Sequence, residues 1–273
     1  MRRLVLAAVV ATVAQTAQAG EMWDALRGGF FSETSTTSNL NWEGVYVGAQ
    51  AGVGTSNMNF SGATKDLIAH MLYMTTIENE MHVSQWPVLG SKSASSKGFG
   101  GFIGYNAQWD AAVIGVEASY MHGTFGGSAF GTMSRSYSAS DGYTYNVTSD
   151  NYAAMTIRDM ATARIRGGWS TGMFLPYGFV GAAIGLGDVQ RTANVYGTGV
   201  NASAPPGFQN IAFNYTESGD QKNAVFFGYS AGLGVDMMLL GCMFLRAEWE
   251  YLRFTHRIDT SVNTFRVGAG YKF

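Results

Sequence analysis

The feature that most constrains the fold is an alternation of side-chain character with a period of two residues. The last segment of the chain shows it most clearly, because apolar residues occupy every second position and Thr, Arg, Gly and Lys lie between them. Successive side chains of a β-strand point to opposite faces, so this alternation predicts a strand with one apolar face. That face consists of Phe265, Val267, Ala269, Tyr271 and Phe273.

The same alternation predicts eight strands in all. Each segment is about 10 residues or longer, which is the length that a tilted strand needs to cross a bilayer. In 174–187 the face assignment stays open, because Gly and Ala are too small to mark a face. The eight predicted strands are 44–54, 98–107, 111–122, 152–169, 174–187, 223–236, 242–255 and 260–273.

The connections between these segments favour a membrane barrel over a soluble sandwich. Long connections at 55–97, 123–151 and 188–222 alternate with connections of a few residues. Outer-membrane barrels place short turns on the periplasmic side and long loops outside. The predicted fold class is therefore all-β, an eight-stranded antiparallel up-and-down transmembrane β-barrel with three long extracellular loops.

Tryptophans support this topology. Trp42, Trp109 and Trp169 all fall at strand ends that the topology assigns to the periplasmic side. An aromatic girdle is expected at that level of an outer-membrane barrel. We therefore expect these three rings in the periplasmic girdle, although packing in a core is the alternative.

The composition of the chain excludes several other classes of protein. Hydrophobic residues make up 47% of the chain and aromatic residues 14%, whereas charged residues make up 13%, about half the usual fraction. Disordered chains are poor in aromatics and rich in charge, so disorder is not expected. The 17 Lys and Arg against 19 Asp and Glu leave no basic excess for nucleic acid. No apolar run after the N-terminus is long enough for a membrane helix.

The N-terminus has the pattern of an export signal. Arg2 and Arg3 precede an apolar stretch, and Ala17, Ala19 and Gly20 mark a small-residue cleavage site. The predicted organisation is a signal peptide at 1–19, a periplasmic lead-in at 20–43 and an outer-membrane barrel at 44–273, exported through the Sec pathway. Cys242 has no second cysteine with which to form an internal disulfide.

Charged residues fall on the face of the strands that would point into the barrel. An eight-stranded barrel has an interior that side chains just fill, so these charges need partners there. Our interpretation is a salt-bridged plug, and the alternative is a gated conduction path. The predicted lumen charges are Glu117, Arg164, Arg166, Arg246, Glu248, Glu250, Arg266 and Lys272.

Catalytic and metal sites have weak support in the sequence. The four histidines fall in three different extracellular connections: His70, His82, His122 and His256. A metal or haem site requires ligands that are closely spaced on a common structural element. The chain contains neither a Gly-x-Ser-x-Gly nor a His-Glu-x-x-His motif. We therefore expect no enzymatic activity, no metal and no cofactor, with solvated loop histidines favoured over a ligand site.

The first long connection contains one helical pattern. Leu67, Ile68, Met71 and Leu72 have the spacing of a short apolar stripe on a helix. A helix packed over the barrel mouth is the favoured interpretation. A surface for a partner or a membrane is the alternative.

Six strand motifs carry a resemblance to a known family. They are Trp42–Gly48, Gly100–Asn106, Arg164–Gly168, Leu175–Tyr177, Glu248–Tyr251 and Phe265–Phe273. These motifs resemble those of the porin-like surface antigens of alphaproteobacteria, which are also called outer-membrane immunogenic proteins. The resemblance covers the strands between 42 and 273 and implies an eight-stranded barrel in the Gram-negative outer membrane. The family has no agreed biochemical activity.

The sequence thus favours a surface protein that displays its extracellular loops in a structural, antigenic or adhesion-like role. A small-solute pore and a haem-binding protein are the alternatives. Expected partners are outer-membrane lipid and lipopolysaccharide, the barrel assembly machinery, and a host or surface ligand of the loops, but no nucleic acid. The final strand, with its aromatic last residue, resembles the C-terminal signal that the assembly machinery recognises.

Overall fold

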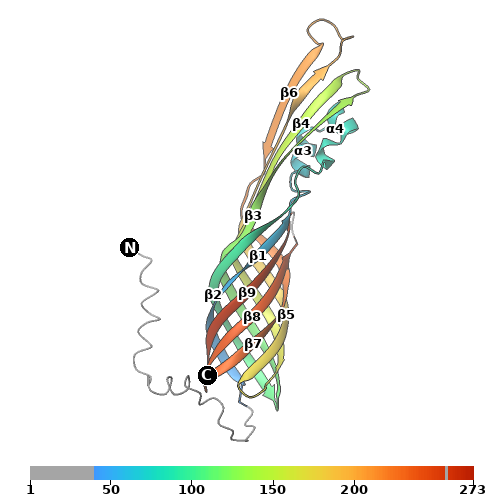
Figure 1. Ribbon diagram of the computed structural model, residues 1–273. Coiled ribbons are helices and arrows are strands. Elements are labelled where there is room, and N and C mark those ends of the chain that lie inside the picture. Colours follow the sequence, from blue (N-terminus) through green and yellow to red (C-terminus); the bar gives the residue numbers. More distant parts are fainter. Residues whose placement is uncertain (1–39, 256–257) are drawn as a thin grey trace, which may run out of the picture. The chain divides into compact units, whose positions relative to one another are not determined.

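Eight antiparallel strands close into a ring (Figure 1). The computed structural model describes residues 40–255 and 258–273, so the signal peptide with its cleavage site and most of the lead-in lie outside the described residues. The eight predicted strands are all present, and this fold class is confirmed. The ring consists of β1 (Gly44–Asn59), β2 (Ser91–Trp109), β3 (Ala112–Ser138), β4 (Thr144–Trp169), β5 (Phe174–Val200), β7 (Gln221–Leu240), β8 (Met243–Phe254) and β9 (Asp259–Lys272).

Pairing of the last strand with the first closes the barrel. β1 and β9 run antiparallel with Tyr46 opposite Lys272 at one end and Asn59 opposite Asp259 at the other. Closure satisfies the backbone groups that a membrane would otherwise leave unpaired. At the turn end, β7 and β8 are joined through Gly241, which has φ +58°, a conformation that suits a residue without Cβ.

The outer wall of the barrel carries an apolar band. On every strand, the outward side chains are apolar or small from the end with the short turns up to one polar residue near the extracellular end. Together these polar residues form a rim around the extracellular end of the barrel. Between turn and rim the strands supply roughly nine or more residues each, which fits an apolar band about 25 Å tall. The rim residues are Thr55, Lys97, His122, Asp159, Asp188, Asn223, Arg253 and Asn263.

The periplasmic girdle contains two of the three tryptophans predicted for it. Trp109 and Trp169 are exposed on the outer wall. Trp42 is only 2% exposed and its ring meets Phe244 inside the barrel. Its backbone N–H donates to Gln108 Oε1 at 2.6 Å. The prediction for Trp42 was wrong because the end of the lead-in enters the barrel mouth instead of running along the outer wall.

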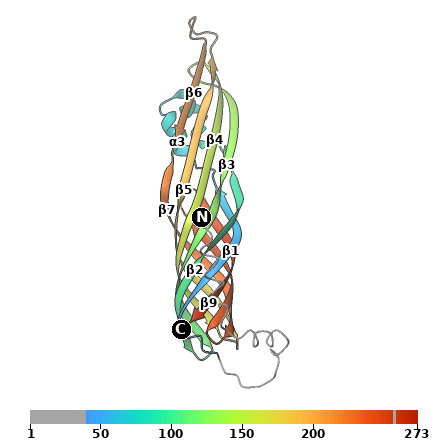
Figure 2. The ribbon, with the colours of Figure 1, turned by 90° about the vertical axis from the view of Figure 1, so that its left-hand side faces the viewer.

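Most of the residues in the three long connections belong to regular structure. β3 and β4 remain paired as far as Ser138 and Thr144, and residues 139–143 join them. β5 also extends beyond the rim, where β6 (Asn210–Ser218) pairs with it outside the ring. Figures 1 and 2 show these strands rising beyond the barrel as one sheet. The prediction of loops at these stretches was wrong because their outward faces are polar and lack the apolar signature of a membrane strand.

Two short helices and a 3₁₀ turn cover one face of this sheet. They are α3 (Lys65–Met71), α4 (Thr76–Met81) and η3 (Val83–Gln85). Ile68 and Leu72 of the expected helix are buried, and they pack against the sheet above the barrel. No helix of the described residues is long and apolar enough to cross a membrane. We call the sheet above the rim, together with α3, α4 and η3, the extracellular module. Its buried apolar residues are Leu67, Ile68, Leu72, Ile77, Val83, Trp86, Tyr145, Val147, Ala193 and Val195.

Candidate functional site

A charged layer occupies the middle of the lumen. The structure buries seven of the eight predicted lumen charges there. Lys272 lies at the opposite end of the barrel from the rim, near the short turns, where its Nζ donates to the backbone oxygen of Glu43 at 3.1 Å. Asp236 takes part in the layer as well, although it was not among the predicted lumen charges. Within the described residues the layer contains four arginines and four carboxylates: Arg164, Arg166, Arg246 and Arg266 with Glu117, Asp236, Glu248 and Glu250.

Glu117 is the centre of this layer. Arg246 donates to its Oε2 at 2.8 Å, and Arg164 forms an ion pair with its other oxygen. The hydroxyl of Tyr46 donates to Oε2 at 2.7 Å. Arg166 approaches the same oxygen at 3.4 Å. Three guanidinium groups from two strands, β4 and β8, therefore converge on one carboxylate.

Asp236 and Glu248 complete the pairing. Arg246 donates two hydrogen bonds to Asp236, of 2.8 and 3.0 Å, and Arg166 donates one of 2.7 Å to the same carboxylate. Arg164 donates hydrogen bonds of 2.6 and 2.8 Å to the two carboxylate oxygens of Glu248. Such two-point contacts between a guanidinium and a carboxylate are among the strongest hydrogen bonds in proteins. Arg266 pairs with Glu250.

Aromatic rings cover the guanidinium planes. Arg166 lies 3.7 Å from the ring centroid of Tyr177, and Arg246 lies 4.0 Å from that of Phe102. Arg164 lies 4.2 Å from Phe179. Cation–π contacts of this kind strengthen when water is excluded. The arginines are therefore held both by carboxylates at their edges and by rings on their faces.

Apolar layers lie on both sides of the charged layer. The lower cluster fills the turn end, and the upper cluster fills the lumen towards the rim. With the charged layer between them, the side chains fill the barrel as expected for eight strands. The lower cluster is Trp42, Tyr46, Phe102, Val113, Leu175, Tyr177, Phe179, Met238 and Phe244. The upper cluster includes Met58, Phe60, Met121, Phe125, Met155, Ile157, Phe226, Leu252 and Phe254.

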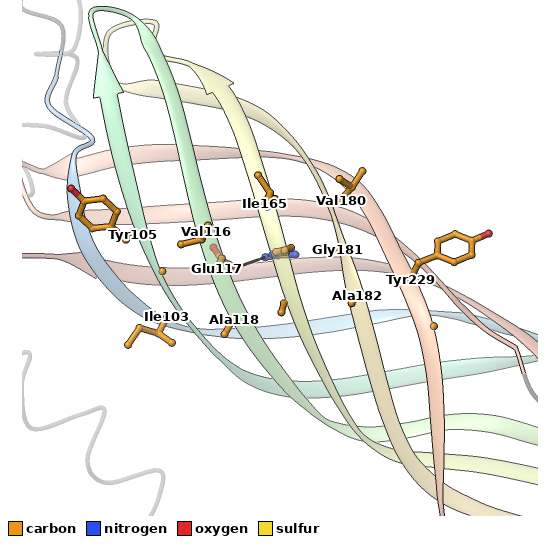
Figure 3. A pocket seen from close by; sticks show the side chains of 14 residues that line it. Ile103, Tyr105, Val116, Glu117, Ala118, Ile165, Val180, Gly181, Ala182 and Tyr229 are labelled. Carbon is orange, nitrogen blue, oxygen red and sulfur yellow. Dashed lines mark hydrogen bonds and ion pairs between the residues drawn. The ribbon is translucent and has the colours of Figure 1, made fainter.

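A shallow hollow lies on the outer wall rather than in the lumen. Its outward lining includes Ile103, Val116, Ile165 and Val180, with the small residue Ala182 between larger neighbours. In Figure 3 these side chains stand on neighbouring strands, and Glu117 reaches towards the interior. The hollow therefore belongs to the apolar band.

The described histidines lie apart from one another. His70 on α3 contacts Glu217 of β6 at 3.0 Å, and this hydrogen bond raises the pKa of His70. His122 at the rim contacts Asp159 at 2.7 Å. His82 ends α4, and His256 lies outside the described residues. Among residues 40–255 and 258–273, no group of three His, Cys, Asp or Glu side chains is placed to hold a metal ion.

The residues predicted as an assembly signal share one face of β9. Phe265, Val267, Ala269, Tyr271 and Phe273 are all exposed on the outer wall. Phe273 packs edge-on against Tyr271, with ring centroids 5.1 Å apart. Its backbone N–H donates to the oxygen of Val45 in the first strand. The last residue thus lies at the seam where the barrel closes.

Comparisons with known proteins identify the family of this chain and distantly similar structures. The family model described as the outer membrane protein beta-barrel domain matches residues 5–273. No protein of curated function matches the chain in sequence. Among solved structures, Ail of Yersinia pestis is similar at 15% identity over 85% of this chain and 99% of that chain, with a TM-score of 0.34.

Two further solved structures are similar at the same distant level. The Neisserial surface protein A shares 13% identity over 84% of this chain and 97% of that one, with a TM-score of 0.29. The N-terminal barrel domain of Pseudomonas aeruginosa OprF shares 13% identity over 82% of this chain and 99% of that one, with a TM-score of 0.23.

Proposed function

Since this chain belongs to the outer membrane protein β-barrel family, we propose that it is a surface-contact protein of the Gram-negative outer membrane, with an adhesion-like or antigenic display role. The observation that carries the proposal is the extracellular module, which has its own apolar core of strands and helices. Binding residues tend to lie where a rigid scaffold presents them. The barrel is the anchor in this proposal, and the module makes the contact.

The filled lumen favours this role over a pore. A conduction path needs continuous water, whereas the charged layer lies between the lower and upper clusters and its charges are paired. Opening it would expose buried ion pairs whose disruption costs several kcal/mol. The separation of the described histidines likewise favours surface contact over haem binding.

The proposed role is non-enzymatic and needs no cofactor. Within the barrel family we assign the chain to the alphaproteobacterial porin-like surface antigens, on the strand motifs given above. We propose export through a Sec signal peptide ending at Ala19. The partners proposed are outer-membrane lipid and lipopolysaccharide, the barrel assembly machinery during insertion, and a ligand on another surface.

A barrel without its module tests the proposal. Three strand pairs lie where the module begins: Asn59 with Ser91, Ser128 with Ala154, and Val189 with Gln221. Joining each pair with a short Asn-Gly-containing turn removes the module and keeps every pairing below it. Cells that display the full chain should attach to other cells or coated surfaces, and cells with the barrel alone should not.

Two readouts make this test decisive. Heat-modifiable gel mobility of both proteins must show an intact barrel, so that lost attachment cannot be blamed on lost folding. Equal attachment by the two strains would refute the proposed function. Steady, large conductance of the full chain in planar bilayers would favour the pore, and a Soret shift that disappears when His70 or His122 is replaced would favour haem binding.

Recognition by the assembly machinery is tested at the last residue. Phe273 is exposed, so its deletion removes little buried surface from the folded barrel. We expect the deletion to lower outer-membrane levels much more than this exposure suggests. Normal surface levels in the deletion strain would leave Phe273 with a girdle role alone.

A further inference from the structure

The outer face of the module, the one that α3 and α4 do not cover, is built from hydroxyl and amide side chains. Four strands contribute to it in paired rows. Among the described residues of this face, Asp150 is the one side chain with a carboxylate, and no Lys or Arg is present. Its polar residues are Ser128, Thr132, Ser134, Ser136, Ser138, Thr144, Asn146, Thr148, Asp150, Gln190, Thr192, Asn194, Thr198, Asn210, Asn214, Thr216 and Ser218.

Charged residues of the module gather on its other side. Arg135 stacks on Trp86 there, Arg191 pairs with Asp66 of α3, and Glu217 contacts His70. A protein surface in water usually has about a quarter to a third charged residues, which keep it soluble. The near absence of charged side chains is therefore a property of the outer face and not of the whole module.

Hydrogen bonds between neighbouring strands hold these polar groups in place. Ser134 Oγ lies 2.8 Å from Thr148 Oγ1, and Thr192 Oγ1 lies 3.1 Å from Ser218 Oγ. A hydroxyl has one donor and two acceptor positions, so each pair keeps bonding capacity towards solvent. Groups fixed on a sheet lose little freedom when a ligand binds. The face is thus a prearranged set of donors and acceptors.

Aromatic rings interrupt the polar rows. Phe130 and Tyr152 lie directly opposite each other on β3 and β4, and they are 68% and 38% exposed. Tyr196 on β5 is 37% exposed. It lies four residues beyond Thr192, the residue of β5 that pairs with Tyr152, which is about 13 Å along the strand. Tyrosine combines an apolar ring with a hydroxyl, which suits a ligand that is apolar on its faces and polar at its edges.

We propose that this face binds an uncharged polysaccharide chain, laid along β4 and β5 with sugar rings against Tyr152 and Tyr196. Sugars present hydroxyl groups around the ring edge and C–H groups on the ring faces, which matches both sets of side chains. The absence of Lys and Arg on the described face gives a sulfated or phosphorylated glycan no cationic partner. A protein partner would be expected to meet a more apolar centre. This inference deepens the proposed function and rests on it.

Binding of the full chain in detergent or nanodiscs to immobilised oligosaccharides tests the inference. The probes are mannan, dextran and N-acetylglucosamine oligomers as uncharged glycans, and a heparin oligosaccharide as a sulfated one. We expect saturable binding to at least one uncharged probe and none to heparin. Tyr152→Ala should weaken that binding roughly five- to tenfold, the loss expected for one aromatic contact.

Two further variants separate recognition from folding. Thr148→Lys places a charge in the middle of the face and should reduce binding at least as much. The matched control is Tyr73→Ala, because Tyr73 is 75% exposed but lies in the segment that joins the helices. It should bind like the parent. All three variants are at exposed or half-buried positions, and gel mobility checks their barrels.

The inference fails if no uncharged probe binds, if heparin binds more tightly, or if Tyr152→Ala and Thr148→Lys bind like the parent. The attachment test distinguishes this failure from that of the proposed function. Cells with Tyr152→Ala that attach normally, while barrel-only cells do not, would keep the surface-contact role and refute the glycan face.

Discussion

The same strands have opposite polarity in the barrel and in the extracellular module. In the barrel part of β4, Arg164 and Arg166 point inwards and Ile165 points outwards. In the module part of the same strand, Val147 is buried and Thr148 is on the outer face. The difference follows the medium on each side. Lipid outside the barrel favours apolar side chains there, whereas water outside the module favours polar ones.

The change of polarity coincides with irregular pairing. Strand pairing shifts between His122 and Phe125, between Ile157 and Asp159, and between Gly187 and Val189. Bulges are common at barrel rims, where they bend a strand and redirect its side chains. In β4 the extra residue is Arg158, which points outwards and pairs with Asp188. The bulge lets β4 change which of its alternating residues face inwards.

The two regions are therefore stabilised by different interactions. Buried, paired charges fill the middle of the barrel, so removing one partner leaves others unpaired. The module depends on apolar packing between a sheet and short helices that could not persist alone. Four predictions test this contrast, from the largest expected effect to the smallest.

Replacing Glu117 by Leu should have the largest effect. Three arginines lose a partner at a site where both sides of each ion pair are buried, and breaking a buried pair typically costs about 3–5 kcal/mol. Urea unfolding in detergent micelles, followed by tryptophan fluorescence, measures the loss. The control is Asp188→Asn at the rim, whose exposed pair with Arg158 should contribute less than about 1 kcal/mol. Equal losses in both variants would show that the charged layer does not hold the barrel together.

Replacing Ile68 by Ala should damage the module and spare the barrel. Ile68 is buried against the sheet, and its truncation should cost about 2–5 kcal/mol within the module. Hydrogen exchange should therefore accelerate in residues 65–86 while the barrel strands keep their protection. Faster exchange throughout the barrel would mean that the two regions unfold as one unit.

Placing Arg on the outer wall should have opposite consequences in the two regions. Leu245 faces outwards in the apolar band, and Leu245→Arg should cost about 2–4 kcal/mol. Thr148 faces outwards above the rim, and Thr148→Arg should change stability by less than about 0.5 kcal/mol. The comparison of unfolding midpoints in lipid vesicles locates the membrane boundary. A tolerated Leu245→Arg would place β8 outside the membrane.

A small pH effect is expected at α3. The hydrogen bond to Glu217 raises the pKa of His70, so the charged imidazolium is favoured in the folded module. Its contribution is complete below the ordinary histidine pKa of about 6.5 and disappears as the pH rises through the raised value. Protection of α3 against exchange, corrected for intrinsic rates, should therefore fall as the pH rises above about 6.5. His70→Gln should abolish that step, and an unchanged step would assign it to another group.

The sequence predicted well which face of a strand each residue occupies, and less well where the residue lies along the barrel axis. Alternation assigned Arg164, Arg246 and Glu248 to the interior, because strand geometry alone decides the face of each residue. It could not show that Lys272 lies at the barrel mouth, since height along the barrel depends on strand tilt and stagger. Asp236 continues the even-numbered inward set from Gly228 to Gly234, so a signal for it was present. Its position at the end of a predicted strand hid it.

What the sequence determined by itself is the number of strands in the barrel ring, their order and the closure of the last on the first, because lipid outside a barrel imposes an alternation that can be read residue by residue. What only the tertiary structure decided is which side chains meet across the lumen and what the long connections become. Glu117 reaches Arg246 across 129 positions of the chain. The strands above the rim have water outside and helices inside, and their polar outer faces become recognisable as sheet only when the helices that cover the other face are in place.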